Sequence, residues 1–166
     1  REFENSKIDF ELFNSADLRI INLEQGTGDH RYHVDKSSVW APSKSIKFLK
    51  NNKIDIVGLA NNHMHDKGEQ GFYNIDNLLK KNNIEYFGAG KNLNRAEAPF
   101  NISDKLSILA YCVYDKPYLN KVKVASNDEY GVNPFSYQKV VNDLNKIDDK
   151  RKVIIFVHWG KENVWF

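Results

Sequence analysis

The chain has 166 residues, 41% of them hydrophobic, and its 24 basic and 22 acidic residues leave a formal net charge of +2. This length favours a single globular domain over residues 1–166. The balanced charge argues against nucleic acid as a partner, which would require a basic face. The single cysteine, Cys112, excludes an internal disulfide and a thiolate zinc site, and no apolar run reaches the roughly 20 residues of a membrane span.

Short apolar runs alternate with amphipathic ones along the chain. Helices are predicted from Ser43, as the N-cap, through Leu49, at residues 71–83 and at residues 137–147, where apolar residues recur at helical spacing. Strands rich in Ile, Val, Leu and aromatic residues are predicted at 17–22, 54–60, 84–90, 106–114 and 152–159. Strands that alternate with helices predict an α/β fold with a largely parallel sheet.

Polar, chemically active residues follow these strands. They are Asn22 and Glu24, then Asn61 to Asp66, then Tyr114 and Asp115, and finally His158 to Glu162, while the remaining strand, at 84–90, ends in the glycine turn Gly88 to Gly90. In open α/β sheets the ligand crevice lies outside the carboxyl ends of the strands. We therefore expect five strand ends to converge on one sheet edge and to bring these groups into one cleft.

Carboxylate, imidazole and carboxamide oxygen together favour a divalent transition metal or zinc over calcium, which prefers oxygen ligands alone. A metal ion held there could polarise a phosphoryl or carbonyl oxygen and activate a bound water, which indicates a hydrolytic site. The alternative is that each strand-end histidine is a hydrogen-bonded structural residue. The sequence pattern alone leaves both interpretations open, the hydrolytic metal site and the structural histidines.

Two irregular segments flank this region. Residues 26–42 form a long polar loop that carries Trp40 and either covers the cleft or is a simple loop without that role. Residues 114–134 carry four side chains that either meet an acidic polymer or phosphate or belong to a solvated face. These are Lys116, Tyr118, Lys121 and Lys123.

Four segments, "ADLRIINLE", "LANNHMHDKGEQG", "FGAGKNLNRAEAP" and "VHWGKE", resemble in order and approximate spacing the CapA family of poly-γ-glutamate capsule biosynthesis proteins. That family is a branch of the calcineurin-like metallophosphoesterases. The resemblance extends from about Ala16 to Glu162. It implies a metallophosphatase-type αββα sandwich, truncated at both ends, so that residues 1–166 would be a partial domain of this type.

The resemblance also implies roles for individual residues. Asn62 matches a metal ligand, and His63 matches a catalytic histidine that stabilises the substrate phosphate. Asp66 would complete the catalytic pair, because a carboxylate can hold an imidazole in one tautomer. Glu24 and His158 match further metal ligands. The residues expected to contact substrate are Asn22, Asn61, Trp159 and Glu162. The implied cofactor is Mn, Fe or Zn in the complete protein.

The chain also departs from the family pattern. Relatives use an Asp-containing motif before the first segment and a Gly-His-x-His segment after the last, and neither occurs in these residues. We therefore expect the complete two-metal site to be missing, and this chain alone to be inactive and to bind no metal. The chain starts at Arg1 and stops just after an apolar strand, so both ends look cut, and an N-terminal membrane anchor is expected to have been lost.

Two functional hypotheses follow. The first is a metal-dependent phosphoesterase-like hydrolase acting on a phosphorylated small molecule or a polymeric substrate of the cell envelope. The second is a non-catalytic factor that binds, exports or assembles an anionic polymer. Both imply other capsule-synthesis subunits as partners, and a protein at the cell surface whose only contact with the membrane is the missing anchor.

Overall fold

The structure is a computed structural model that describes residues 5–29, 39–114 and 122–160. The chain divides into two compact units, one made of residues 1–58 and 63–86 and the other of Leu59–Asn62 with residues 87–166. Within the described residues there are five α-helices and two three-stranded sheets, with two smaller two-stranded sheets. The predicted α/β class is confirmed.

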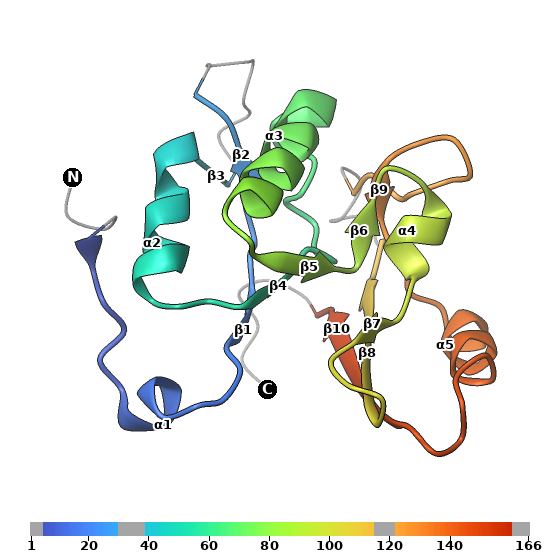
Figure 1. The fold of residues 1–166 in the computed structure, drawn as a ribbon. Coiled ribbons are helices and arrows are strands. Elements are labelled where there is room, and N and C mark those ends of the chain that lie inside the picture. The colour runs from blue at the N-terminus through green and yellow to red at the C-terminus, as the bar shows by residue number, and fades with distance from the viewer. Residues whose placement is uncertain (1–4, 30–38, 115–121, 161–166) are drawn as a thin grey trace. The chain divides into compact units, whose positions relative to one another are not determined.

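The first unit is built around a sheet with the strand order β1-β4-β5 (Figure 1). Its elements are α1 (Glu11–Asn14), β1 (Ile20–Asn22), β2 (Gly26–Thr27), β3 (Trp40–Ala41), η2 (Ser43–Ser45), α2 (Ile46–Asn51), β4 (Ile56–Gly58), α3 (Gly68–Lys81) and β5 (Glu85–Phe87). β1 and β4 run parallel, with Ile20 opposite Ile56 and Asn22 opposite Gly58. All three residues of β4 are buried, as expected for a central strand covered on both faces.

The predicted helix at 71–83 forms as α3 and begins at Gly68, whose φ of +62° suits glycine. Phe72, Ile75 and Leu79 are buried on one face, which is the spacing of three and four residues that indicated the helix. The helix predicted after Ser43 also forms, but Ser43 is not its cap. Residues Ser43–Ser45 form η2 instead, and the backbone N–H of Ser43 donates to Asp29 Oδ1 at 2.8 Å. The capping acceptor therefore comes from a distant carboxylate.

Both helix-to-strand turns of this unit use the same backbone device. After α2, the N–H groups of Lys53 and Ile54 donate to the carbonyls of Lys50 and Leu49, and Lys53 has a φ of +52°. After α3, Asn83, with a φ of +55°, and Ile84 repeat the pattern on Lys80 and Leu79. These are Schellman motifs, which satisfy the last helical carbonyls and turn the chain sharply. Each ends on a buried isoleucine, Ile54 or Ile84, that leads into the next strand of the sheet.

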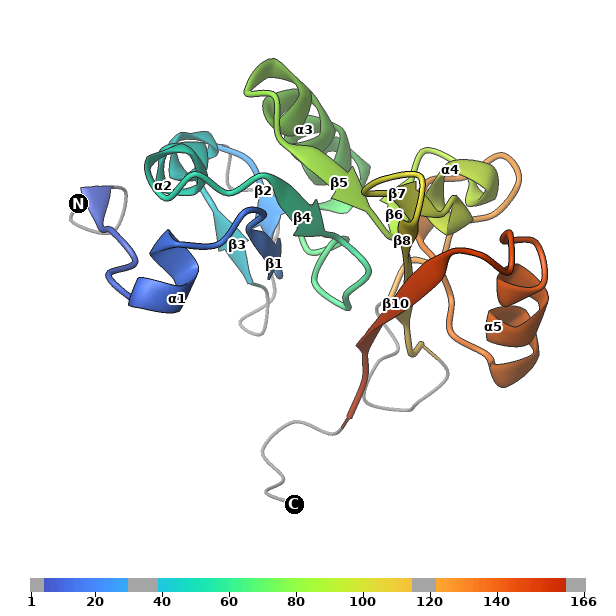
Figure 2. The ribbon, with the colours of Figure 1, turned by 60° about the horizontal axis from the view of Figure 1, so that its bottom comes forward.

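The second unit is built around the sheet β10-β8-β7. Its elements are β6 (Ala89–Gly90), α4 (Leu93–Glu97), β7 (Phe100–Asn101), β8 (Leu106–Cys112), β9 (Gly131–Val132), α5 (Tyr137–Leu144) and β10 (Lys152–His158). β10 runs parallel to β8 over seven residues, from Lys152 opposite Leu106 to His158 opposite Cys112 (Figure 2). β8 is buried along almost its whole length, so this strand is the core of the unit.

The strand predicted at 84–90 is divided at Gly88, which lies between β5 and β6 with a φ of +83°. A Cβ at this position would lie 2.7 Å from Ala60 Cβ and 2.9 Å from Ala110 Cβ. Real Cβ atoms do not approach so closely, so only glycine fits. The bend at Gly88 separates two short strands that belong to different sheets.

Candidate functional site

The predicted site residues lie in two groups, one in each unit. β1, β4 and β5 belong to one sheet, whereas β8 and β10 belong to another. The expectation that five strand ends share a single sheet edge is therefore wrong. The expectation fails because the chain bends at Gly88, and the two long strands that follow, β8 and β10, pair with each other.

His63 and Asp66 form the centre of the first group. Both lie in the turn between β4 and α3, where the N–H of Asp66 donates to the His63 carbonyl at 3.1 Å. His63 Nδ1 lies 2.6 Å from Asp66 Oδ2, and the same oxygen accepts the N–H of Val39 at 2.6 Å. A carboxylate only accepts hydrogen bonds, so the imidazole proton is on Nδ1. Asp66 therefore fixes the tautomer and the orientation of His63.

Glu24 is held beside this pair. It follows β1, where the N–H of Leu23 donates to the carbonyl of Gly58 at 3.0 Å. Glu24 Oε2 accepts from Asn22 Nδ2 at 2.9 Å, and Glu24 Oε1 lies 3.8 Å from His63 Nε2. Four of the predicted site residues, Asn22, Glu24, His63 and Asp66, are thus brought together within one unit. His63 Nε2, the ring nitrogen that does not contact Asp66, therefore faces the Glu24 carboxylate.

The second group joins Asn62 to His158. His158 Nε2 lies 2.8 Å from Asn62 Oδ1, although the two residues are 96 positions apart. β10 positions the histidine, because its last residue lies opposite Cys112 and its carbonyl accepts the N–H of Val113 at 3.0 Å. The amide oxygen of Asn62 and the Nε2 nitrogen of His158 therefore face each other at hydrogen-bonding distance.

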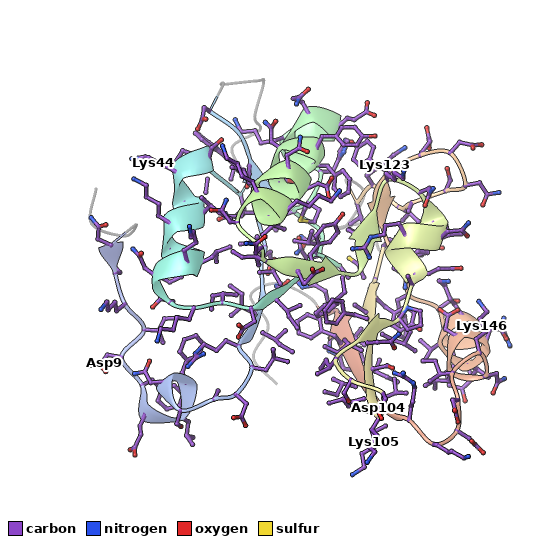
Figure 3. The ribbon with its side chains drawn as sticks, viewed as in Figure 1. Asp9, Lys44, Asp104, Lys105, Lys123 and Lys146 are labelled. Atoms are coloured by element: carbon purple, nitrogen blue, oxygen red, sulfur yellow. The ribbon has the colours of Figure 1, made fainter. Side chains whose placement is uncertain are left out.

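The remaining predicted contacts to substrate are placed differently. Asn61 is 1% exposed, so its side chain points into the protein interior. Trp159, at 75% exposed, lies fully at the surface beyond the end of β10. Glu162, Asp115, Lys116, Tyr118 and Lys121 lie outside the described residues. Lys123 is described and pairs with Glu129 Oε2 at 2.7 Å, as expected for a charged surface (Figure 3).

Lys67 supports the first group and was not singled out from the sequence. It is a lysine with only 4% of its surface exposed, and its Nζ lies 3.9 Å from the centre of the Trp40 ring. Such an ammonium is stabilised by the electron-rich ring face. The backbone at Gly26 and Gly71 approaches its aliphatic stem closely, because an added Cβ would lie 3.1 Å from Lys67 Cγ at Gly26 and 2.2 Å from Lys67 Cβ at Gly71. In the sequence, these two glycines were the available indication that the Lys67 side chain is buried.

An ion network centred on the buried Asp143 joins α5 to β8 in the second unit. Tyr111 donates to Asp143 Oδ2 at 3.1 Å, and Asp143 also pairs with Lys139 at 3.2 Å and Lys146 at 3.0 Å. Burial, reinforced by the neighbouring Asp143 carboxylate, raises the pKa of the Tyr111 phenol well above its ordinary value. The network attaches α5 to β8. All of its charges are paired, which indicates a structural role.

The residues present were compared with the metal ligands that the resemblance implies. Among residues 5–29, 39–114 and 122–160, no three His, Cys, Asp or Glu side chains are clustered closely enough to hold a metal ion. The pair Asn62 and His158 nevertheless combines an amide oxygen with an imidazole, which are ligand types of transition-metal and zinc sites. In this structure the two are joined by a hydrogen bond that His158 Nε2 donates to Asn62 Oδ1, so Nε2 would have to lose its proton to bind a metal ion. In the part of the chain that is described, no helix is long and apolar enough to cross a membrane.

Comparison with known proteins identifies the family. The sequence pattern of the family described as "Bacterial capsule synthesis protein PGA_cap" matches residues 7–166, which is nearly the whole chain. The chain belongs to this PGA_cap family. The predicted resemblance to CapA proteins is thus confirmed, and the calcineurin-like superfamily is consistent with it.

Two relatives of this PGA_cap chain are named for the same process. "Capsule biosynthesis protein CapA" of Bacillus anthracis is 23% identical over 127 residues, which is 74% of this chain and 31% of the relative. "PGA biosynthesis protein CapA" of Bacillus subtilis (strain 168) is 25% identical over 157 residues, covering 91% of this chain and 41% of the relative. The chain therefore spans less than half the length of either relative.

Proposed function

We propose that this PGA_cap chain carries part of a metal-dependent, phosphoesterase-like hydrolytic site that acts in capsule synthesis at the cell envelope. The observation that carries the proposal is the 2.8 Å contact between Asn62 Oδ1 and His158 Nε2. These are two of the residues that the family resemblance implies as metal ligands, and they meet across 96 positions of sequence. A bound metal ion would polarise a phosphoryl oxygen and activate water.

His63 would act on the substrate in this proposal. The contact between Nδ1 and Asp66 Oδ2 holds the imidazole ring, and with it Nε2, in a fixed direction. A histidine oriented in this way can accept a proton from, or donate one to, an oxygen of the substrate phosphate. The carboxylate of Glu24 faces this nitrogen, with Oε1 at 3.8 Å from Nε2.

The test measures metal binding and hydrolysis separately. Calorimetry with Mn²⁺ and Zn²⁺, and turnover of a generic phosphodiester, would be compared for the 166-residue chain and for a version extended to the length of its relatives. Asn62→Ala and His158→Ala should each weaken metal binding by about 10- to 100-fold. His63→Ala should leave metal binding intact and abolish hydrolysis. His65→Ala, a histidine of the same turn, is the matched control.

A second function is favoured by the surroundings of Glu24. This carboxylate accepts from Asn22 and faces His63, so it already has partners within the protein. A protein that keeps the fold without hydrolysis would bind, export or assemble the anionic capsule polymer with other capsule-synthesis subunits. Polymer binding would then survive a chelator and weaken with salt. Hydrolysis that disappears in His63→Ala but persists in His65→Ala would rule out this alternative.

The proposed place of action is the cell surface, with the protein tethered to the membrane outside the residues described here. The names of the relatives, which refer to capsule and PGA biosynthesis, support an envelope location. Fractionation of cells that express the longer version, with detection of this domain by antibody on intact cells, tests the location. Detection only after the cells are broken would contradict it.

A further inference from the structure

Residues 39–40 contact the turn between β4 and α3 through two neighbouring pairs. The backbone N–H of Val39 donates to Asp66 Oδ2 at 2.6 Å. The next residue of each segment makes the second contact, since Lys67 Nζ lies 3.9 Å from the centre of the Trp40 ring. Two adjacent contacts between the same two segments restrain rotation as well as distance. This part of the chain is therefore fixed against the turn.

The first contact sets the direction of the Asp66 carboxylate. Its Oδ2 accepts from the Val39 N–H and lies against His63 Nδ1, each at 2.6 Å. The Asp66 side chain is only 9% exposed, so water competes little for these hydrogen bonds. The terminal torsion of an aspartate is broad, and a single donor would let the carboxylate turn. The orientation of the His63 ring therefore depends on where the Val39 N–H lies.

The strand pairing that holds Val39 is short. β2 and β3 pair over two residues each, and the N–H groups of Gly26 and Gly28 donate to the carbonyls of Val39 and Ala41 at 3.0 and 3.2 Å. β2 in turn lies against α3 (Figure 1). So small a pair of strands is marginal by itself. The contact of the Trp40 ring with the turn adds a restraint that the pairing does not supply.

Lys67 is a rigid anchor for this ring. It is buried, and its stem runs between the backbone at Gly26 and at Gly71, which approach it closely. The Lys67 carbonyl also accepts the Gly71 N–H at 3.1 Å, at the start of α3. A contact between a cation and a ring is stronger for a desolvated ammonium than for an exposed one. The Trp40 ring thus rests on a group that the fold holds in place.

We propose that Trp40 is a positioning residue for His63. Its ring holds β3 on Lys67, β3 presents a backbone N–H to Asp66, and Asp66 orients the imidazole. Trp40 contacts neither the substrate nor a reacting atom in this role. The inference rests on the proposed catalytic role of His63, and it gives a function to the aromatic residue of the segment 26–42.

The orientation of His63 can be measured without substrate. The ¹⁵N chemical shifts of its imidazole would be recorded for the 166-residue chain at one pH in EDTA, and identified by their absence in His63→Ala. A single tautomer separates the shifts of the two ring nitrogens, and exchange between tautomers brings them together. Trp40→Leu should move the two shifts towards each other. Trp40→Phe keeps a ring for Lys67 and should change them about half as much or less.

The matched control is Phe10→Leu, which removes another exposed aromatic ring from the same unit and should leave the shifts unchanged. Kinetics of the extended version then separate positioning from general damage. Trp40→Leu should lower kcat about tenfold while KM changes less than about twofold, and Trp40→Phe should keep kcat within about threefold. Urea unfolding is measured alongside, because a residue with only a structural role would lower stability without moving kcat or the shifts.

Lys67→Met tests the route from the ring to the turn. Methionine keeps an unbranched stem between the two glycines and removes the ammonium group. Alone it should reproduce the effect of Trp40→Leu, and the double variant should change little further, since both residues act through one contact. Lys80→Met, which removes an exposed lysine of α3, is the control.

Unchanged imidazole shifts in Trp40→Leu would overturn the proposal. Equal changes in Trp40→Leu and Phe10→Leu, or additive effects of Trp40→Leu and Lys67→Met, would overturn it as well. If the shifts move as expected but the extended version hydrolyses nothing, the positioning of His63 stands and the proposed hydrolytic function fails. If the extended version hydrolyses the phosphodiester and Trp40→Leu leaves kcat and the shifts unchanged, the proposed function stands and this inference fails.

Discussion

Gly88→Ala tests whether the bend between β5 and β6 depends on the absence of a side chain. The glycine has a φ of +83°, and a left-handed conformation costs an L-residue roughly 1–2 kcal/mol. The added Cβ would lie 2.7 Å from Ala60 Cβ and 2.9 Å from Ala110 Cβ. Overpacking of a closed core site costs about 1–3 kcal/mol more. We expect a total loss of about 2–5 kcal/mol, which is a large fraction of the stability of a typical domain.

The assay is urea unfolding followed by circular dichroism, with Gly68→Ala as the matched control. Gly68 has a φ of +62° but no atom within 4 Å of the position of an added Cβ, so only the backbone cost of roughly 1–2 kcal/mol applies. The difference between the two variants isolates the steric cost. Ala60→Gly in the Gly88→Ala background should recover part of it. Equal losses in the two single variants would refute the reasoning.

Three further predictions concern single side chains. Asp66→Asn should release His63 from its fixed tautomer, and the ¹⁵N chemical shifts of the imidazole would report this change. An unchanged spectrum would contradict the assignment. The raised pKa of Tyr111 stabilises the folded state fully below pH 10.0, and this contribution is lost as the pH rises above that value. Tyr111→Phe should therefore lose stability less steeply than the unmodified chain between pH 10 and pH 11 in urea titrations. Asn52→Ala removes the side-chain oxygen that accepts the Ile8 N–H at 2.5 Å, and should lower the free energy of unfolding by about 1–3 kcal/mol. Hydrogen exchange of the Ile8 amide should become faster, and unchanged exchange would refute this prediction.

The long elements could be predicted from the sequence because each one repeats its own signal. β8, β10 and α3 carry enough consecutive apolar or periodic residues to identify themselves. Strands of two residues, such as β2 and β9, carry no such signal, since they exist only where a partner lies opposite them. The cap of η2 was missed for the same reason, because Asp29 supplies it from outside the segment.

The site shows the same division between local and distant information. The contact of His63 with Asp66 spans three residues, so a local pattern could indicate it. The types of the proposed metal ligands could also be predicted from the strand ends. The meeting of Asn62 with His158 depends on the seven-residue register of β10 against β8, which the sequence does not specify. Lys67 was missed because its partner, the Trp40 ring, is remote in the chain.

The only cysteine of the chain gives this fold a built-in reporter. Cys112 is completely buried and lies opposite His158, the residue that meets Asn62. A thiol reagent can reach it only when the structure around the end of β8 opens. The rate of its modification therefore measures how often this end of β8, opposite His158, opens. A ligand that contacts His158 should slow that rate, so labelling can detect binding without any knowledge of the reaction.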